Sequence, residues 1–196
     1  MDGVADNYAT SIRAINLINY LRMKKQILAL GFILISSFCF AQEAQTAQKS
    51  LLPSVEVKTL DGKKINIKNL SNNGKPIIIS FWATWCKPCV KELPAMAEVY
   101  QQWQKETGVK LVAVSVDDAR SSAKVGPLVD GKAWEYEVLL DDNGDLKRAM
   151  NVNEVPHMFI INGNGEIVWQ HTSFADGGEL EVIQIIKKII AGEPIN

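Results

Sequence analysis

The sequence has little cysteine and histidine and no concentration of charge of one sign. Its 196 residues include three cysteines and two histidines, and 21 basic against 22 acidic side chains leave a formal net charge of −1. Proteins that follow a phosphate backbone or an anionic membrane surface use clustered lysine and arginine. We therefore expect neither nucleic acid nor an anionic lipid surface as a partner.

The chain is also poor in metal ligands. A structural zinc site takes four ligands, mostly from cysteine and histidine pairs at short spacing. Apart from Cys39 near the N-terminus, the candidates are Cys86 and Cys89 with the isolated His157 and His171. The prediction is that the protein uses no metal and no organic cofactor.

Long apolar runs are scarce, and the one near the N-terminus is short. It extends from Ile27 to Phe40, less than the roughly 20 residues of a membrane-spanning helix. Met23-Lys24-Lys25 precedes it, and it ends at the small residue Ala41. This order is typical of a secretory signal peptide, with cleavage expected after Ala41.

Four segments are predicted along the chain. Residues 1–22 look like an upstream extension from a misassigned start codon, because a signal peptide begins at its initiator methionine. Residues 23–41 are the signal peptide, 42–52 a flexible linker rich in Gln, Ala and Ser, and 53–193 one folded domain. The product is expected to be a soluble periplasmic or otherwise extracytoplasmic monomer. A retained anchor, or a lipid on Cys39, would instead tether it to a membrane.

Within 53–193, strand patterns alternate with helical ones, which predicts an α/β fold with a central mixed sheet flanked by helices. A β-hairpin is expected first, with strands at 55–59 and 64–67. Further strands are predicted at 76–82, 109–116, 136–140, 157–161 and 166–171, and helices at 88–105, within 119–133, at 146–150 and at 179–190.

Two of these helices have apolar positions at helical spacing that could face the core. In 88–105 the candidates are Val90, Leu93, Ala97, Val99 and Tyr100, with Pro94 as a kink. In 179–190 they are Leu180, Ile183, Ile186 and Ile190.

The stretch WCKPC, residues 85–89, lies where a buried strand meets a helix. There Cys86 would face unpaired backbone N–H groups and the positive end of the helix dipole, which lower a thiol pKa. Cys89, one turn later, could attack a mixed disulfide formed by Cys86. A redox pair is thus favoured over half a metal site or two inert core cysteines.

FWATWCKPC resembles the active site of the thioredoxin superfamily, and CKPCVKELP is similar to its exported TlpA/ResA-like branch of thiol-disulfide oxidoreductases. The stretch VPHMFIINGNGEIV extends the resemblance toward the C-terminus. The resemblance implies a thioredoxin-like fold over about residues 53–192 and a cis-proline at Pro156. It also implies that Glu92 assists proton transfer, since the thioredoxin acid on the central strand is replaced here by Ser80.

The same resemblance suggests which residues meet the substrate: Trp85, Lys87, Pro88 and Val155, with Pro156 presenting the substrate backbone. His157, next in the chain, could tune the sulfurs. The implied activity is reduction of protein disulfides, as in cytochrome c maturation, with electrons from a membrane thiol donor. A disulfide-forming oxidant of the same fold, or a binding module with incidental redox activity, are the alternatives.

Overall fold

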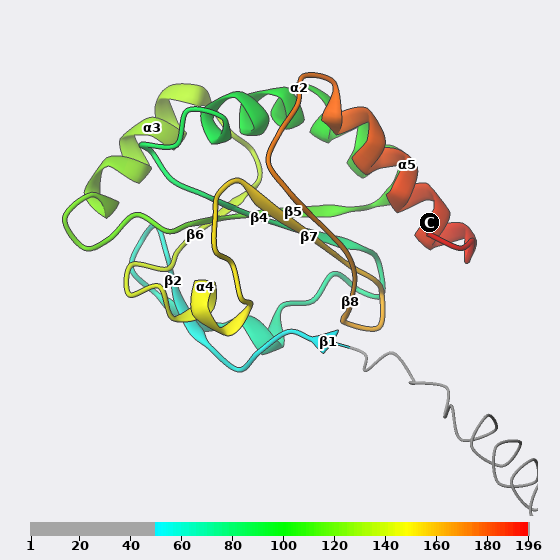
Figure 1. Ribbon diagram of the computed structural model, residues 1–196, viewed down its shortest axis with the longest axis horizontal. Coiled ribbons are helices and arrows are strands. Elements are labelled where there is room, and N and C mark those ends of the chain that lie inside the picture. The colour runs from blue at the N-terminus through cyan, green and yellow to red at the C-terminus, as the bar shows by residue number, and fades with distance from the viewer. Residues whose placement is uncertain (1–49, 196) are drawn as a thin grey trace, which may run out of the picture. The chain divides into compact units, whose positions relative to one another are not determined.

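The computed structural model describes residues 50–195, and the predicted segments 1–22 and 23–41 and most of the linker lie outside this range. Its core is an eight-stranded mixed sheet with the order β1-β8-β7-β4-β5-β6-β2-β3 (Figure 1). Within residues 50–195, no helix is long and apolar enough to span a membrane. The predicted mixed sheet and its leading hairpin are confirmed.

Strand β4 (Ile77–Trp82) is the centre of this sheet, and all six of its residues are buried. It runs parallel to β5 (Lys110–Ser115) and antiparallel to β7 (His157–Ile161). A strand covered on both faces needs an unbroken apolar sequence, which IIISFW supplies apart from one serine. The predicted central strand is therefore confirmed.

The remaining strands complete the sheet on either side. Strand β6 (Glu137–Leu140) pairs parallel with β5, and the hairpin β2 (Glu56–Thr59) and β3 (Lys64–Asn66) follows beyond it. On the other side, β8 (Glu166–Thr172) pairs antiparallel with β7, and the short β1 (Ser50–Leu51) pairs with β8.

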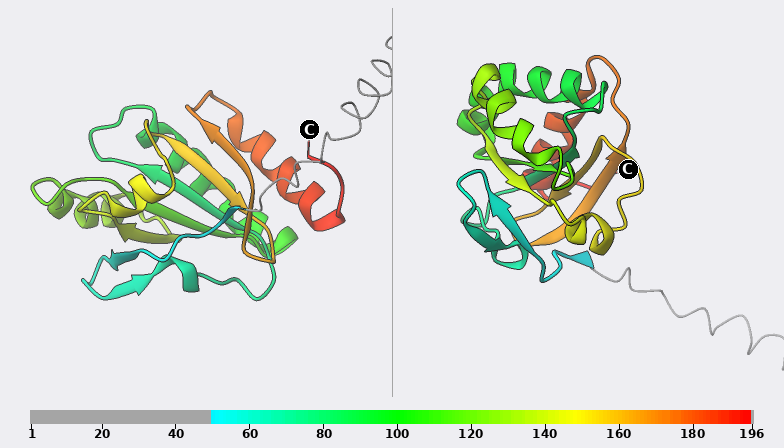
Figure 2. Two further views of the ribbon diagram at one scale, coloured as in Figure 1. Left: turned by 60° about the horizontal axis from the view of Figure 1, so that its bottom comes forward. Right: turned by 90° about the vertical axis from the view of Figure 1, so that its left-hand side faces the viewer.

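Helices cover both faces of the sheet (Figures 1 and 2). One face packs against α2 (Cys89–Thr107), α3 (Val125–Lys132) and α5 (Gly178–Ala191), around a cluster that includes Trp82 and Leu93. The other face packs against the short α4 (Asp145–Ala149) and the 3₁₀ turn η1 (Ile67–Asn69). A second 3₁₀ turn, η2 (Ser122–Lys124), leads into α3.

Two boundaries differ from the sequence-based expectation. Residues 50–52, expected in the linker, belong to the domain, because β1 pairs with β8 and Leu52 is buried. Ile67, expected to end a strand, begins η1, where the side chain of Asn66 accepts a hydrogen bond from the Lys68 N–H. That side-chain cap turns the chain out of the hairpin.

The buried faces of α2 and α5 are shifted from the predicted ones. In α5, Ile183 and Ile186 are buried as expected, but Leu180 is 63% and Ile190 52% exposed, and Val182 and Ile185 are buried instead. In α2, Leu93 and Tyr100 are buried, and Glu92, Met96 and Trp103 join them, while Val90, Ala97 and Val99 are half-buried. Helical spacing alone leaves the angular position of the buried face uncertain by about one residue.

The turn between β7 and β8 touches the loop before β4 at one pair of glycines. A Cβ placed on Gly163 would lie 2.0 Å from the carbonyl oxygen of Gly74. Real side chains do not approach backbone that closely, so only glycine fits at position 163.

We predict that Gly163→Ala lowers the free energy of unfolding by about 2 kcal/mol, because the methyl group must displace backbone on one side of the contact. Gly131→Ala is the control, since a Cβ at this helical glycine meets nothing within 4 Å. Denaturant unfolding of the two variants measures the difference. Equal stabilities would show that the Gly74–Gly163 approach is not a tight constraint.

Candidate active site

Cys86 and Cys89 form a disulfide at the carboxyl end of β4, where the chain turns into α2. Cys86 is 5% exposed and Cys89 is fully buried. Of the two sulfur-bearing residues, Cys86 is thus the one that a partner can reach. The assignment of Cys86 as the attacking cysteine and Cys89 as the resolving one stays a prediction.

The start of α2 gives the Cys86 sulfur one backbone donor. The Cys89 N–H donates to Cys86 Sγ at 3.2 Å, and the Cys86 carbonyl accepts the first i→i+4 bond from Val90 at 3.1 Å. Pro88 has helical dihedrals and no N–H of its own. In the reduced protein, the same N–H and the positive end of the helix would stabilise a Cys86 thiolate.

Val155 and Pro156 close the other side of the disulfide. The Val155–Pro156 peptide bond is cis, and the Val155 carbonyl oxygen lies 3.5 Å from Cys86 Sγ. Pro156 is buried and Val155 is partly exposed. The structure therefore brings together two segments that are about seventy residues apart in the sequence.

Glu92 is buried within α2, one turn beyond Cys89. It is 3% exposed, and its Oε2 accepts a hydrogen bond from Ser80 Oγ on β4 at 3.0 Å. Burial raises the pKa of Glu92 to about 7, although the Ser80 hydrogen bond opposes the shift. A carboxyl group with such a pKa can take up and release a proton near neutral pH.

Glu92 also lines a pocket between β8 and α5. The pocket has a volume of about 130 Å³ and a mostly apolar lining that includes Met96, Met158 and Trp169. His171 and Ser173 also line it. Glu92 therefore both binds Ser80 and contributes to the wall of this pocket.

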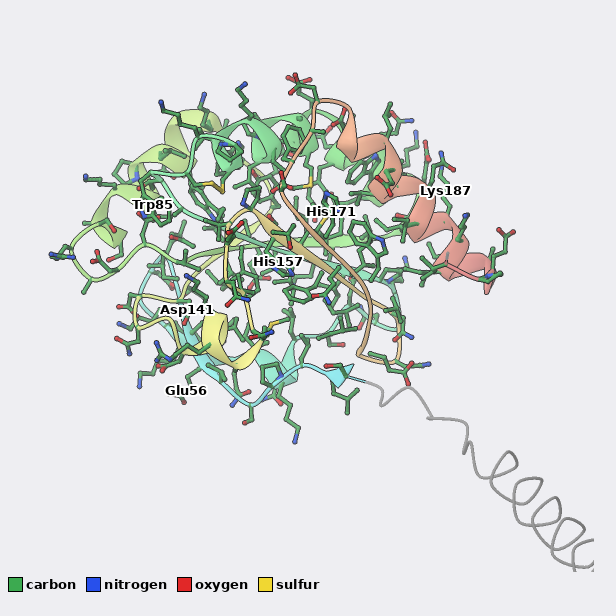
Figure 3. The ribbon with its side chains drawn as sticks, viewed as in Figure 1. Glu56, Trp85, Asp141, His157, His171 and Lys187 are labelled. Carbon is green, nitrogen blue, oxygen red and sulfur yellow. A yellow bond between two sulfur atoms is a disulfide. The ribbon has the colours of Figure 1, made fainter. Side chains whose placement is uncertain are left out.

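The remaining predicted site residues lie on the outer surface around the disulfide. Trp85 is 64% exposed (Figure 3), and Lys87 and Pro88 are also exposed. An exposed tryptophan of this size can contribute to docking a partner.

His157 is turned toward β8. Its Nε2 is 3.2 Å from Gln170 Oε1, its Nδ1 is 3.4 Å from Thr172 Oγ1, and its ring stacks on Phe159 at 4.5 Å. Burial lowers the pKa of His157, an effect that the Gln170 contact partly offsets. His171, on β8, stacks on Trp169. His157 lies on β7 and His171 on β8, and Figure 3 shows both labels apart from Trp85.

Two polar features next to the cysteines escaped the sequence analysis. Ser80 was read only as the loss of a buried acid, yet it is the partner of Glu92. Asp117, just after β5, accepts hydrogen bonds from Thr84 and Ser115. The sequence signal for this contact would have been that β4 and β5 are parallel neighbours, so that their carboxyl ends meet at one sheet edge.

Comparison with known proteins places the chain among thiol-disulfide oxidoreductases. The AhpC/TSA family matches residues 49–170. The thiol-disulfide oxidoreductase ResA of Bacillus cereus is 32% identical over 82% of this chain and 88% of its own length. An uncharacterized thioredoxin-like protein from Porphyromonas gingivalis, solved in solution, is 53% identical, with a TM-score of 0.66 over 74% of this chain and 94% of its own. StoA from Bacillus subtilis is 28% identical, with a TM-score of 0.54 over 67% of this chain and 99% of its own.

Fold, disulfide and relatives together define a thioredoxin-like thiol-disulfide oxidoreductase. The chain belongs to the AhpC/TSA family, and the relatives named ResA specify its type within that class. The predicted thioredoxin-like fold and enzyme class are thereby confirmed.

We predict that Glu92→Gln makes the oxidised protein more stable than the wild type at pH 8, by about 3 kcal/mol, and nearly equal to it at pH 4.5. The pKa of Glu92 in the folded protein, about 7, is above the ordinary glutamate value of 4.5 that applies in the unfolded chain. Between these values the unfolded chain ionises while the folded one holds its proton, so wild-type stability falls as the pH rises and then levels off.

Denaturant unfolding across this pH range measures the effect, with Glu98→Gln, at an exposed position of the same helix, as the control. A constant difference between Glu92→Gln and the wild type from pH 4.5 to pH 8 would show that Glu92 has an ordinary pKa.

Proposed function

We propose that this protein is an exported reductase of protein disulfides. The observation that carries the proposal is the placement of Cys86, which has the Cys89 N–H and the start of α2 on one side and the Val155 carbonyl on the other. A thiolate stabilised there attacks disulfides, and an adjacent buried cysteine completes the exchange.

The exchange proceeds in two steps. The Cys86 thiolate attacks one sulfur of a substrate disulfide, whose S–S bond breaks and releases one substrate thiolate. Cys89 then gives its proton to the carboxylate of Glu92 and attacks Cys86 Sγ, which releases the second substrate thiolate. Two electrons pass from the dithiol to the substrate, both substrate thiolates take up protons, and the Cys86–Cys89 disulfide remains.

Glu92 is suited to the second step because of its pKa. With a value near 7, a sizeable fraction of Glu92 is ionised at neutral pH and can accept the Cys89 proton. Ser80 supports this role because its hydrogen bond favours the ionised form. Burial of Cys89 restricts competing proton acceptors from bulk water.

Substrate contacts are assigned to the exposed surface around Cys86. Trp85 offers an aromatic face, Lys87 and Pro88 flank the sulfur, and the backbone at Val155, ahead of Pro156, presents polar groups to an extended peptide. These residues would recognise the protein backbone near a disulfide rather than a small molecule.

The oxidised product needs a reductant for the next cycle. We assign this role to a membrane thiol donor, because a protein exported by a signal peptide at 23–41 would be separated from cytosolic reductants. A monomer whose CxxC is its sole cysteine pair after cleavage can then pass electrons from donor to substrate without a metal or organic cofactor.

The competing activity is disulfide formation by the same fold, and the reduction potential distinguishes the two. We predict a potential near or below about −230 mV for the Cys86–Cys89 pair, as in reductases, whereas a strong oxidant lies near about −120 mV. Equilibration in glutathione or dithiothreitol buffers, with alkylation to count free thiols, gives the value. A potential near the oxidant figure would reverse the assigned direction.

A binding module with incidental redox activity is the second alternative. We predict that Cys89→Ser accumulates mixed disulfides through Cys86, because the buried resolving thiol is gone, and that Cys86→Ser accumulates none. Non-reducing gels of cells that express each variant show the adducts. If Cys86→Ser retained the biological role of the wild type, the protein would act by binding rather than by turnover.

A further inference from the structure

Asp117 is a buried carboxylate that holds the chain just before the cysteines. It is 1% exposed, and its Oδ2 accepts the Thr84 N–H and the Ser115 hydroxyl, each at 2.8 Å. Its Oδ1 accepts the Thr84 hydroxyl at 2.6 Å. The backbone N–H and the hydroxyl of Thr84 therefore both donate to the same side chain.

Ser115 fixes the carboxylate in turn. The Asp117 N–H donates to Ser115 Oγ at 3.1 Å, so the Ser115 hydroxyl proton is directed to Asp117 Oδ2. Ser115 is the last residue of β5 and is fully buried. Asp117 thus joins Thr84 to the end of β5 through hydrogen bonds.

Thr84 belongs to the turn that carries Cys86. The Val116 N–H donates to the Trp82 carbonyl at 2.8 Å, and the Cys86 N–H donates to the Ala83 carbonyl at 3.1 Å. With Thr84 clamped between these two bonds, the path from β4 to Cys86 is held at successive residues. Loss of the clamp would free the segment whose place decides how Cys86 meets Cys89.

We propose that Asp117 is a positioning residue that sets the redox equilibrium of the Cys86–Cys89 pair through its clamp on Thr84. All three of its side-chain bonds come from neutral donors, and among the described residues no ion pair to Asp117 is found. Asp117 can therefore act on Cys86 in two ways. Its hydrogen bonds fix the turn before Cys86, and no described cation neutralises its negative charge.

Both effects favour the disulfide over the dithiol. A fixed turn keeps the Cys86 sulfur beside Cys89, so that closing the bond orders little additional chain. The Asp117 carboxylate is bonded to Thr84, which precedes Cys86 by two residues, and a negative charge there disfavours the thiolate, the form that stabilises the reduced state. Removing Asp117 should therefore make the protein easier to reduce.

The test is the equilibrium in which the protein disulfide and two glutathione molecules give the dithiol and glutathione disulfide. We expect Asp117→Asn to shift it about tenfold toward the dithiol, or about 30 mV. The pH midpoint of Cys86 alkylation by iodoacetamide should fall, because the negative charge is gone. Thr84→Val keeps the charge and loses one bond, so it should shift the equilibrium by a smaller factor and leave the alkylation midpoint unchanged.

Asp118→Asn is the matched control, because Asp118 is the adjacent aspartate but binds Arg120 and Ser121 at the surface. It should change neither quantity. Asp117 is only structural if two results are found together. Asp117→Asn and Thr84→Val would lower the melting temperature equally in both redox states. Neither variant would change the glutathione equilibrium constant by more than twofold or move the pH midpoint of alkylation. If Asp117→Asn does not fold, the equilibrium of Thr84→Val decides. An equal shift in Asp118→Asn would also overturn the proposal. The reduction potential of the wild type, which tests the direction of the proposed function, is independent of these differences.

Discussion

Burial of β4 on both faces is the constraint on which the rest of the structure depends. Its side chains alternate between the two cores, with Ile78 and Trp82 toward α2 and α5 and Ile77 and Phe81 toward α4. A strand fixed on both faces cannot slip in register without exposing a whole row of apolar groups. The residue after β4 is therefore held in place, and the cysteine turn is built on that fixed end.

The same central strand supplies the polar partner of the site. Ser80 is the one hydroxyl in IIISFW, and it meets Glu92 from the first turn of α2. Burying a carboxyl group is costly unless it is protonated or hydrogen-bonded. The pKa of Glu92 is raised to about 7 because burial disfavours its ionised form. A glutamate with this pKa can exchange a proton near neutral pH. A loss of stability at high pH is thus linked to a chemical capability.

The sequence predicted those features that local patterns encode. The apolar run of β4, the hairpin at 56–66 and the CxxC at a strand-to-helix junction all follow from spacing and turn residues within a few positions. Contacts between distant segments could not be predicted in this way. The Ser80–Glu92 bond depends on how α2 lies against β4, and the Thr84–Asp117 bonds depend on the pairing of β4 with β5. Leu180 was misplaced because the helical period does not say which side of α5 meets the sheet.

Two buried acidic side chains, Glu92 and Asp117, bind residues of the segments that lead to and from the cysteine pair, and their hydrogen-bond partners differ. Glu92 has one hydroxyl donor and lies deep among apolar groups, so burial prevails and its proton is held until near neutral pH. Asp117 receives three hydrogen bonds, two from Thr84 in the turn after β4 and one from Ser115 at the end of β5. These hydrogen bonds fix the backbone and side chain of Thr84 to the end of β5. Along the chain, Glu92 follows Cys89 by three residues in α2, whereas Asp117 binds Thr84, which precedes Cys86 by two residues.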